Sequence, residues 1–198
     1  MDSGNFAWSI AATALVLFMT PGVAFFYGGL VKAKSVVSMM MMSFGAMGLI
    51  SVLWILYGFN MSLGGGSLAF AGNPFGPEGQ NFALANLDSA TLIGAAFGAT
   101  FAIITVALIS GAIADRAKFG SWLIFAGIFA TVGYFPIAAW VWGGGWIMSL
   151  GETFGFSASV IDYAGGTAVH INAGAAALAL ALVLGKRIGF QKGIQKPH

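Results

Sequence analysis

The chain of 198 residues contains no cysteine and few charges, with only 7% of its residues being Asp, Glu, Lys or Arg. Without cysteine, a disulfide framework and thiolate chemistry are both excluded. Because soluble domains average about 25% charged residues, the composition also excludes an ordinary soluble domain. The chain is instead 59% hydrophobic. It is therefore predicted to be an integral membrane protein.

The residue pattern also argues against several classes of function. The eight Lys and Arg residues are too few and too dispersed for a nucleic-acid-binding surface, despite a net charge of +2. The sequence shows no nucleophile–base pair, phosphate-cradling loop or cluster of metal ligands, so no enzyme activity, cofactor or metal site is predicted. The first residues, Met-Asp-Ser-Gly-Asn, lack the basic segment that begins a signal peptide. The first apolar segment is therefore expected to remain as a membrane span.

Five stretches are long and apolar enough to cross a bilayer, which takes roughly 20 residues of helix. Pro21 and Pro136 are expected to kink the first and the fourth of them. The segment between the second and third spans, residues 60–88, is rich in Gly, Asn and Pro, and we expect an ordered exposed loop there. The sequence thus predicts an all-α integral membrane protein with spans at residues 6–27, 36–59, 89–114, 120–141 and 164–184.

The basic residues all fall on one side of the predicted spans. Of the six acidic residues, only Asp115 shares that side. Because Lys and Arg concentrate in cytoplasmic loops, we expect the N-terminus outside and these loops inside a cell (inner or plasma) membrane. The basic residues are Lys32, Lys34, Arg116, Lys118, Lys186, Arg187, Lys192 and Lys196.

Two ionisable residues stand at the start of the fifth span. His170 is the only histidine within a predicted span, and ionisable groups are costly at membrane depth, which favours function over hydrogen-bonded packing. An imidazole can donate from one nitrogen and accept at the other, so it suits a small polar guest. Asp162 lies eight residues earlier. It either binds a cation or caps the helix by accepting from the amides of Ala164 or Gly165.

Aromatic residues mark two further candidate positions. Phe97 and Phe101 lie four residues apart on one face of the third span, and Leu108 follows seven residues later. Such a stripe either packs against lipid or core, or lines a hydrophobic constriction of a pore. Trp142, near the outer end of the fourth span, is either an interfacial anchor or a ring face that holds a small cation.

Four motifs together resemble the ammonium transporter (Amt/Mep/Rh) family, and its bacterial Amt branch in particular. The shared order and spacing extend over residues 1–198, which read as part of one ammonium transporter domain. The resemblance implies an eleven-span homotrimer, each subunit being built from two inverted five-helix repeats plus a final helix, with this chain similar to the first repeat. The motifs are PGVAFFYGG at residues 21–29, GAIADR at 111–116, VWGGG at 141–145 and DYAGGTAVHIN at 162–172.

The resemblance also implies roles for individual residues. Trp142 and Phe97, supported by Asp162, match a site that recruits ammonium outside the membrane. Phe101 matches one half of a phenylalanine gate, and His170 matches the first of two pore histidines. The second gate phenylalanine, the recruitment serine and the partner histidine of the family have no counterpart in these 198 residues. The remaining pore-lining positions implied by the resemblance are Leu108, Val141, Phe26 and Tyr27.

The residues and the resemblance together predict transmembrane ammonium transport. NH4+ is expected to bind outside, to lose its proton before or within the constriction at Phe101, and to cross as NH3 past His170. Ammonium, ammonia and methylammonium are the expected substrates, and a PII-type regulatory protein is a candidate partner on the cytoplasmic face. Two alternatives stay open: an Amt-like ammonium sensor that conducts little, and a membrane fragment that does not transport.

Overall fold

The structure is a computed structural model that describes residues 2–64, 70–187 and 190. All regular elements in this part of the chain are helical. Among the described residues, five helical segments are long and apolar enough to cross a membrane, so the predicted five-span, all-α architecture is confirmed. The first span is longer at both ends than the sequence predicted. The five segments are Ser3–Leu30, Ala33–Gly58, Ser89–Ile113, Phe119–Val141 and Gly166–Leu184.

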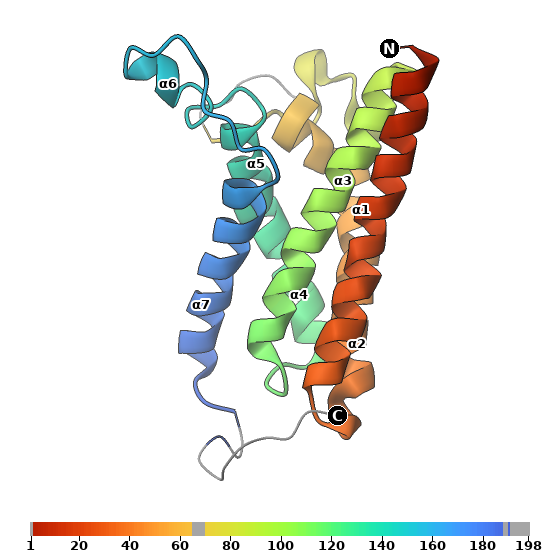
Figure 1. The fold of residues 1–198 in the computed structure, drawn as a ribbon, viewed down its shortest axis with the longest axis vertical. Helices are drawn as coiled ribbons and strands as arrows, with labels where there is room; N and C mark the ends of the chain where they lie inside the picture. Colours follow the sequence, from red (N-terminus) through yellow and green to blue (C-terminus); the bar gives the residue numbers. More distant parts are fainter. Residues whose placement is uncertain (1, 65–69, 188–189, 191–198) are drawn as a thin grey trace.

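The spans form a bundle in which neighbouring spans in the sequence run in opposite directions, because each connection lies at one end and the next span runs back to the other (Figure 1). A short additional helix, α6, lies in the connection before the fifth span, to one side of the bundle (Figure 1). The α-helices are α1 (Ser3–Leu30), α2 (Val36–Leu53), α3 (Ser89–Ile109), α4 (Phe119–Phe129), α5 (Phe135–Val141), α6 (Leu150–Thr153) and α7 (Asn172–Leu184).

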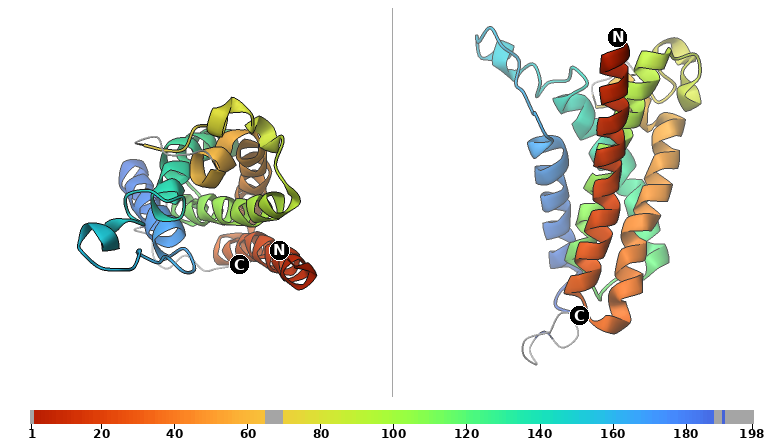
Figure 2. Two further views of the ribbon diagram at one scale, coloured as in Figure 1. Left: turned by 90° about the horizontal axis from the view of Figure 1, so that it is seen from above. Right: turned by 45° about the vertical axis from the view of Figure 1, so that its right-hand side comes forward.

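Helix α3 occupies the middle of the bundle, where it packs against α1, α2 and α7 (Figure 2). In an apolar stretch of 18 residues from the span that contains α3, 56% is buried inside the bundle. The corresponding share for the span formed by α1 is 11%. Small residues on α3, such as Ala95, Gly98 and Ala102, are buried at these contacts. Because lipid offers no hydrophobic force that drives helices together, close approach of backbones at small residues stabilises such crossings. Helix α3 is therefore the element against which the candidate site is built.

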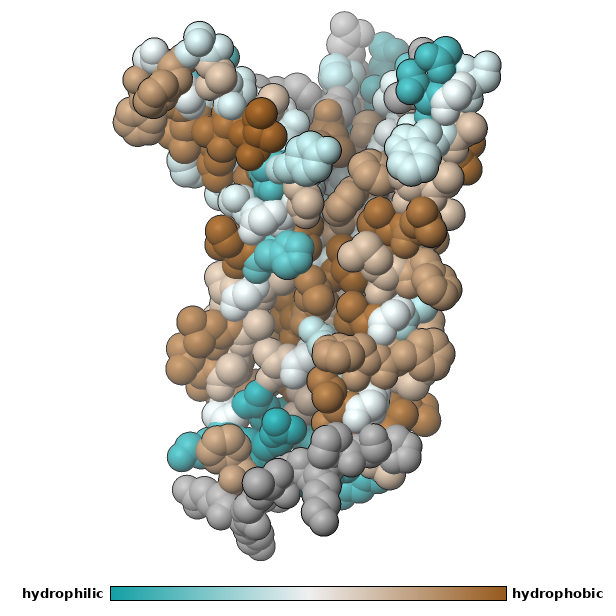
Figure 3. Space-filling model, viewed as in Figure 1, coloured by the Kyte–Doolittle hydropathy of each residue, from teal (hydrophilic) through white to brown (hydrophobic). Residues whose placement is uncertain are grey.

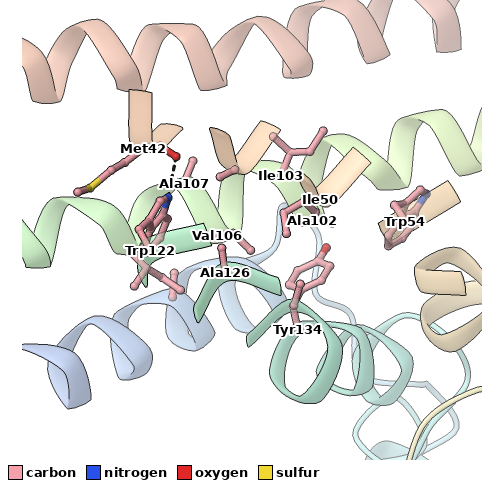
Figure 4. Close-up of a cluster of buried hydrophobic side chains, with 14 of the residues drawn as sticks. Met42, Ile50, Trp54, Ala102, Ile103, Val106, Ala107, Trp122, Ala126 and Tyr134 are labelled. Atoms are coloured by element: carbon pink, nitrogen blue, oxygen red, sulfur yellow. Dashed lines mark hydrogen bonds between the residues drawn. The ribbon is translucent and has the colours of Figure 1, made fainter. Parts of the chain in front are cut away.

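The core contains two tryptophans, Trp122 and Trp54, whose ring N–H groups donate to main-chain carbonyls of neighbouring helices; Figure 4 shows both rings and the bond from Trp122 to Met42. Trp122 Nε1 donates to Met42 O at 2.8 Å, and Trp54 Nε1 donates to Ala95 O at 2.9 Å. A donor without a partner is costly in a membrane interior, so both bonds stabilise the packing. They join α4 to α2, and the end of the second span to α3.

Three of the spans contain a π-helical turn, at Trp54–Gly58 (η2), Ala130–Tyr134 (η7) and Gly166–Ile171 (η8). Such turns are rare, and they occur mostly as single turns, frequently at functional sites. At Pro136, where a kink was expected, the chain forms the π-helical turn η7 directly before α5. Proline has no N–H with which to continue the α-helical hydrogen-bond pattern. Pro21, by contrast, lies inside α1, which continues as α-helix to Leu30.

Asn60 organises the connection between the second and third spans. Its Nδ2 donates to Pro74 O at 3.2 Å and to Asn81 O at 2.9 Å, which holds the returning chain against the end of the span. Short 3-10 turns at Pro77–Gly79 and Phe82–Leu84 follow. The described part of the connection contains these turns, residues 65–69 lie outside the described residues, and an ordered loop stays a prediction.

The basic connections lie at one end of the bundle (Figure 1). Lys32 precedes α2, Arg116 and Lys118 precede α4, and Arg187 follows α7; Lys192 and Lys196 lie outside the described residues. Figure 3 shows apolar side chains over the middle of the bundle and hydrophilic residues gathered towards its two ends. This distribution fits a membrane-spanning bundle, while its orientation in the membrane stays a prediction.

Candidate functional site

Three cavities follow one another along α3. We call the one nearest the start of α3 the outer cavity (about 350 Å³), the next the middle cavity (about 110 Å³) and the last the inner cavity (about 380 Å³). Phe101 lines both the outer and the middle cavity, and Leu108 lines both the middle and the inner cavity. These two side chains lie seven residues, or about two helical turns, apart. They therefore separate the three cavities from one another.

The outer cavity is lined mostly by aromatic rings. The Phe97 and Phe101 ring centroids are 4.9 Å apart at 82°, and those of Phe101 and Trp142 are 5.7 Å apart at 64°. These edge-to-face contacts connect the fourth span to α3 and fix the three rings relative to one another. Aromatic ring faces attract cations. The full lining is Trp54, Leu63, Gly94, Phe97, Gly98, Phe101, Tyr134, Ala138, Trp142, Asp162 and Tyr163.

Asp162 joins the start of the fifth span to the aromatic rings. Its carboxylate accepts from the amides of Gly166 at 2.7 Å, and of Thr167 and Ala168 at 2.9 Å each. Its main-chain carbonyl accepts from Trp142 Nε1 at 2.8 Å. The capping role expected from the sequence is present, but the predicted donors were wrong. Because the residue before η8 adopts a left-handed conformation, the first free amides begin at Gly166.

His170 lies in η8 and lines the middle cavity, whose other walls are apolar. Its Nδ1 is 3.0 Å from Gly165 O. Since a carbonyl oxygen only accepts, the proton in this bond belongs to Nδ1, and Nε2 of the neutral ring remains as an acceptor. In the described part of the chain, no three His, Cys, Asp or Glu side chains come together as metal ligands. The arrangement therefore provides one hydrogen-bonding nitrogen in an apolar cavity.

The inner cavity combines aliphatic walls with one tyrosine and one guanidinium. Tyr27 donates its hydroxyl to Leu108 O at 3.0 Å, which connects α1 to α3 at this depth. Arg187 lines the cavity, and its Nη1 lies 3.8 Å from Asp115 Oδ2. Arg116 donates to the carbonyls of Ala112 and Gly185, and so holds the end of α7 against the turn after α3.

Two residues predicted to line a pore do not line any of these three cavities. Phe26 is 63% exposed and lies beside the ring of Tyr27, with centroids 5.9 Å apart. Val141 is 2% exposed and packs inside the bundle. Conversely, Trp54 and Tyr134 line the outer cavity although sequence reasoning passed over them. A tryptophan within a span was the available signal, because its N–H needs a partner there.

The candidate site can be compared with known proteins. A family model described as Ammonium Transporter Family matches residues 7–198. The chain belongs to this family. It is 49% identical to an ammonium transporter of Mycobacterium tuberculosis over 100% of this chain and 46% of the relative. It is 40% identical to the ammonium transporter Amt1 of Archaeoglobus fulgidus, over 100% of this chain and 47% of the relative.

Solved structures agree with the fold. Mep2 of Candida albicans superposes with a TM-score of 0.81 at 34% identity, over 94% of this chain and 40% of that one. A protein named Sensor Amt Protein superposes with a TM-score of 0.79 at 26% identity, over 93% and 45% of the two chains. The chain spans about half the length of the curated relatives it matches, and it corresponds to the N-terminal half of their fold.

Proposed function

We propose that this chain forms the N-terminal half of a pathway that conducts ammonium across the membrane, in which the cation is captured in the outer cavity and crosses the middle cavity as NH3. The observation that carries the proposal is the row of three cavities along α3, in which Phe101 lines the first two and Leu108 lines the last two. The family match supports ammonium as the substrate, because the matched relatives are named ammonium transporters.

Capture rests on the chemistry of the outer cavity. A small cation is attracted both by the faces of Trp142 and the neighbouring phenylalanines and by the negative charge of Asp162. Both Asp162 carboxylate oxygens already accept from amides of η8, so we propose that the carboxylate acts through its field and through its hold on Trp142. Ring faces are then the direct contact for NH4+.

Crossing requires a change of charge state. The middle cavity, at about 110 Å³, is lined by apolar side chains apart from His170. A bare cation loses most of its hydration in such a space, at a cost of several kcal/mol or more. Ammonia carries no charge, and it can donate an N–H to the free Nε2 of His170. We propose that, on the outer side of Phe101, NH4+ transfers its proton to solvent water, which becomes H3O+ and returns to bulk, and that NH3 proceeds alone.

Release follows in the inner cavity. NH3 that passes Leu108 reaches a larger space lined by Tyr27 and Arg187. The guanidinium charge repels cations, so ammonium that forms again on this side is discouraged from returning. The basic residues at this end further support a cytoplasmic location and a candidate contact with a PII-type regulator. A cell-membrane location with the N-terminus outside, which rests on the one-sided basic residues, and a homotrimeric assembly, which rests on the family resemblance, complete the proposal.

The test is uptake of radiolabelled methylammonium by cells that lack other ammonium transporters and express the full-length gene product. Trp142→Leu is expected to weaken capture, and His170→Ala is expected to abolish or strongly reduce conduction. Trp146→Leu is the matched control for the first, because Trp146 lies on the same outer side, 56% exposed, and lines none of the three cavities. Unchanged uptake in both Trp142→Leu and His170→Ala would contradict the proposal.

The similarity to a protein named Sensor Amt Protein makes sensing the second candidate function. A sensor shares the outer cavity and binds ammonium there, but it supports little flux. Saturable ammonium binding by the full-length protein, combined with no methylammonium uptake, would favour sensing over transport.

A further inference from the structure

A single glycine, Gly165, lies between the two ionisable residues that the start of the fifth span brings to the site. It directly precedes η8 and has φ of 81° and ψ of 28°, the left-handed conformation that residues with a side chain rarely adopt. Before it in the chain is Asp162, which lines the outer cavity, and after it is His170, which lines the middle cavity. The conformation of Gly165 therefore determines how the chain passes from one cavity to the next.

The carbonyl of Gly165 is the acceptor that makes the first turn of the fifth span a π-helical one. In an α-helix this oxygen accepts from the amide four residues later, and the amide of Val169 does donate to it at 2.9 Å. The amide of His170, five residues later, donates to the same oxygen at 2.9 Å, which is the bond of a π-turn. Nδ1 of the His170 ring also reaches this oxygen, at 3.0 Å. The wider turn thus brings the amide and the ring of His170 to one acceptor.

This contact fixes both the orientation and the tautomer of the His170 ring. The carbonyl only accepts, so the proton of the neutral ring is held on Nδ1 and Nε2 remains an acceptor. The other side chains around the middle cavity are apolar, so this nitrogen is the acceptor that they do not supply. A ring released from Gly165 would rotate and exchange its tautomer, and would present that acceptor only part of the time.

A side chain at position 165 would disturb both cavities. A Cβ atom there would lie 2.7 Å from Cγ2 and 3.0 Å from Cβ of Val169, and 3.4 Å from Cη2 of Trp142. Val169 is buried, and its Cβ moves only with the backbone of η8, which also carries His170. The Trp142 ring is held in place by its bond to Asp162 O. Relief of these contacts therefore requires η8, the Trp142 ring or both to move.

We infer that Gly165 is a positioning residue for both steps of the proposed pathway. Its left-handed conformation directs the first amides of η8 to Asp162, and its carbonyl holds the His170 ring with Nε2 as the acceptor. The inference rests on the proposed function, because it assigns a further residue to the same two cavities. Gly165 acts through Asp162, Trp142 and His170, so its substitution changes capture and conduction together.

The first experiment compares Gly165→Ala with Gly166→Ala in the full-length protein, by the concentration dependence of methylammonium uptake. Gly165→Ala is expected to raise the half-saturation concentration and to lower the maximal rate, each by about fivefold, which corresponds to the loss of one hydrogen bond. Gly166→Ala is the matched control, because Gly166 is not left-handed and its Cβ would lie 3.8 Å from Asp162 Oδ1, an ordinary contact. Its effect is expected to be the smaller one.

The second experiment depends neither on transport nor on the folding of a glycine variant. Nitrogen NMR of the unaltered full-length protein, isotopically labelled at histidine, identifies which ring nitrogen of neutral His170 carries the proton. The signal is assigned by its loss in His170→Ala. We expect a proton on Nδ1 and none on Nε2. In Gly165→Ala we expect the signals of a mixture of the two tautomers.

The outcomes distinguish the inference from the proposed function. A neutral His170 that is protonated on Nε2, or equal uptake kinetics in Gly165→Ala and Gly166→Ala, overturns the inference and leaves the proposed function intact. A change in Gly165→Ala that is confined to half-saturation or to maximal rate also overturns it, because only one step would then depend on Gly165. No methylammonium uptake by the unaltered protein overturns the transport function, and the NMR measurement still tests the contact between Gly165 and His170.

Discussion

The outer and inner cavities are similar in volume, at about 350 and 380 Å³, but opposite in chemistry. The outer one combines aromatic rings with the Asp162 carboxylate, whereas the inner one combines aliphatic walls with Tyr27 and the Arg187 guanidinium. Size therefore does not distinguish entrance from exit. In the proposed pathway, therefore, the sign of the charge and the presence of ring faces, and not cavity size, set the side on which the cation is captured.

The largest expected effect comes from breaking the outer cavity at Asp162. Asp162→Ala removes the acceptor of three η8 amides, and it frees the loop whose carbonyl holds Trp142. Hydrogen bonds to a charged acceptor are among the stronger ones, so η8 and the Trp142 ring both lose their positions. We expect methylammonium uptake at low concentration to fall about tenfold or more.

Asp88→Ala is the matched control for this variant. Asp88 caps α3 in the same way, accepting from the amides of Ala90 and Thr91 at 2.8 and 3.0 Å, but it lines none of the three cavities. It is expected to lower thermal stability while methylammonium half-saturation stays unchanged. Equal losses of uptake in the two variants would show that capping alone, and not the outer cavity, explains the effect of Asp162.

A smaller effect is expected at the inner cavity. Arg187→Gln removes the charge but keeps a polar side chain of similar reach. A partly exposed charge changes local interactions by about 0.2–1 kcal/mol, so ammonium that enters from the inner-cavity side should bind about twofold more tightly. The measurement is the half-saturation of methylammonium efflux from preloaded vesicles. Lys34→Gln is the control, because this exposed lysine does not line the inner cavity. A weaker efflux affinity in Arg187→Gln would reverse the assigned role of the charge.

The smallest effect concerns pH and the outer end of α3. Two hydrogen bonds from Thr91 lower the pKa of Asp88. The bond from the Thr91 amide has the larger effect, and the bond from its hydroxyl has the next largest. A carboxyl with a lowered folded-state pKa stabilises the protein above its unfolded pKa, and this contribution is lost as pH falls through the folded value. The difference in melting temperature between the unaltered protein and Asp88→Asn should therefore shrink below pH of about 3.9. A difference that stays constant from neutral to acid pH would contradict this.

Much of the fold was predictable because membrane spans depend on local composition. A run of about 20 apolar residues is sufficient to indicate a helix, and all five predicted spans are present. The π turns were not predicted, since they depend on tertiary contacts and not on the hydrophobic pattern. At Pro136 the sequence indicated a disturbance, but not that the chain would accommodate it as the wider turn η7.

The candidate site was predictable where residues carry unusual chemistry for a membrane, and less so elsewhere. Asp162 and His170 are conspicuous as ionisable residues, and both line cavities in the structure. Val141 and Phe26 do not line any of the three cavities. The rotation of a helix about its axis decides which of its apolar residues face a cavity, and the apolar pattern of the sequence does not specify that rotation. The close packing of Trp54 on α3 at Gly98, where a Cβ would lie 2.8 Å from the ring, could not be predicted, because only the three-dimensional structure brings these two residues together.

The central claim, capture outside and neutral passage within, is tested most directly by the concentration dependence of methylammonium uptake in Trp142→Leu and His170→Ala. Capture and conduction are separate steps in the account, so the two variants should differ in kind. Trp142→Leu is predicted to raise the half-saturation concentration with little change in maximal rate. His170→Ala is predicted to lower the maximal rate with little change in half-saturation. The same kinetic change in both variants, or the reverse assignment, would contradict the account.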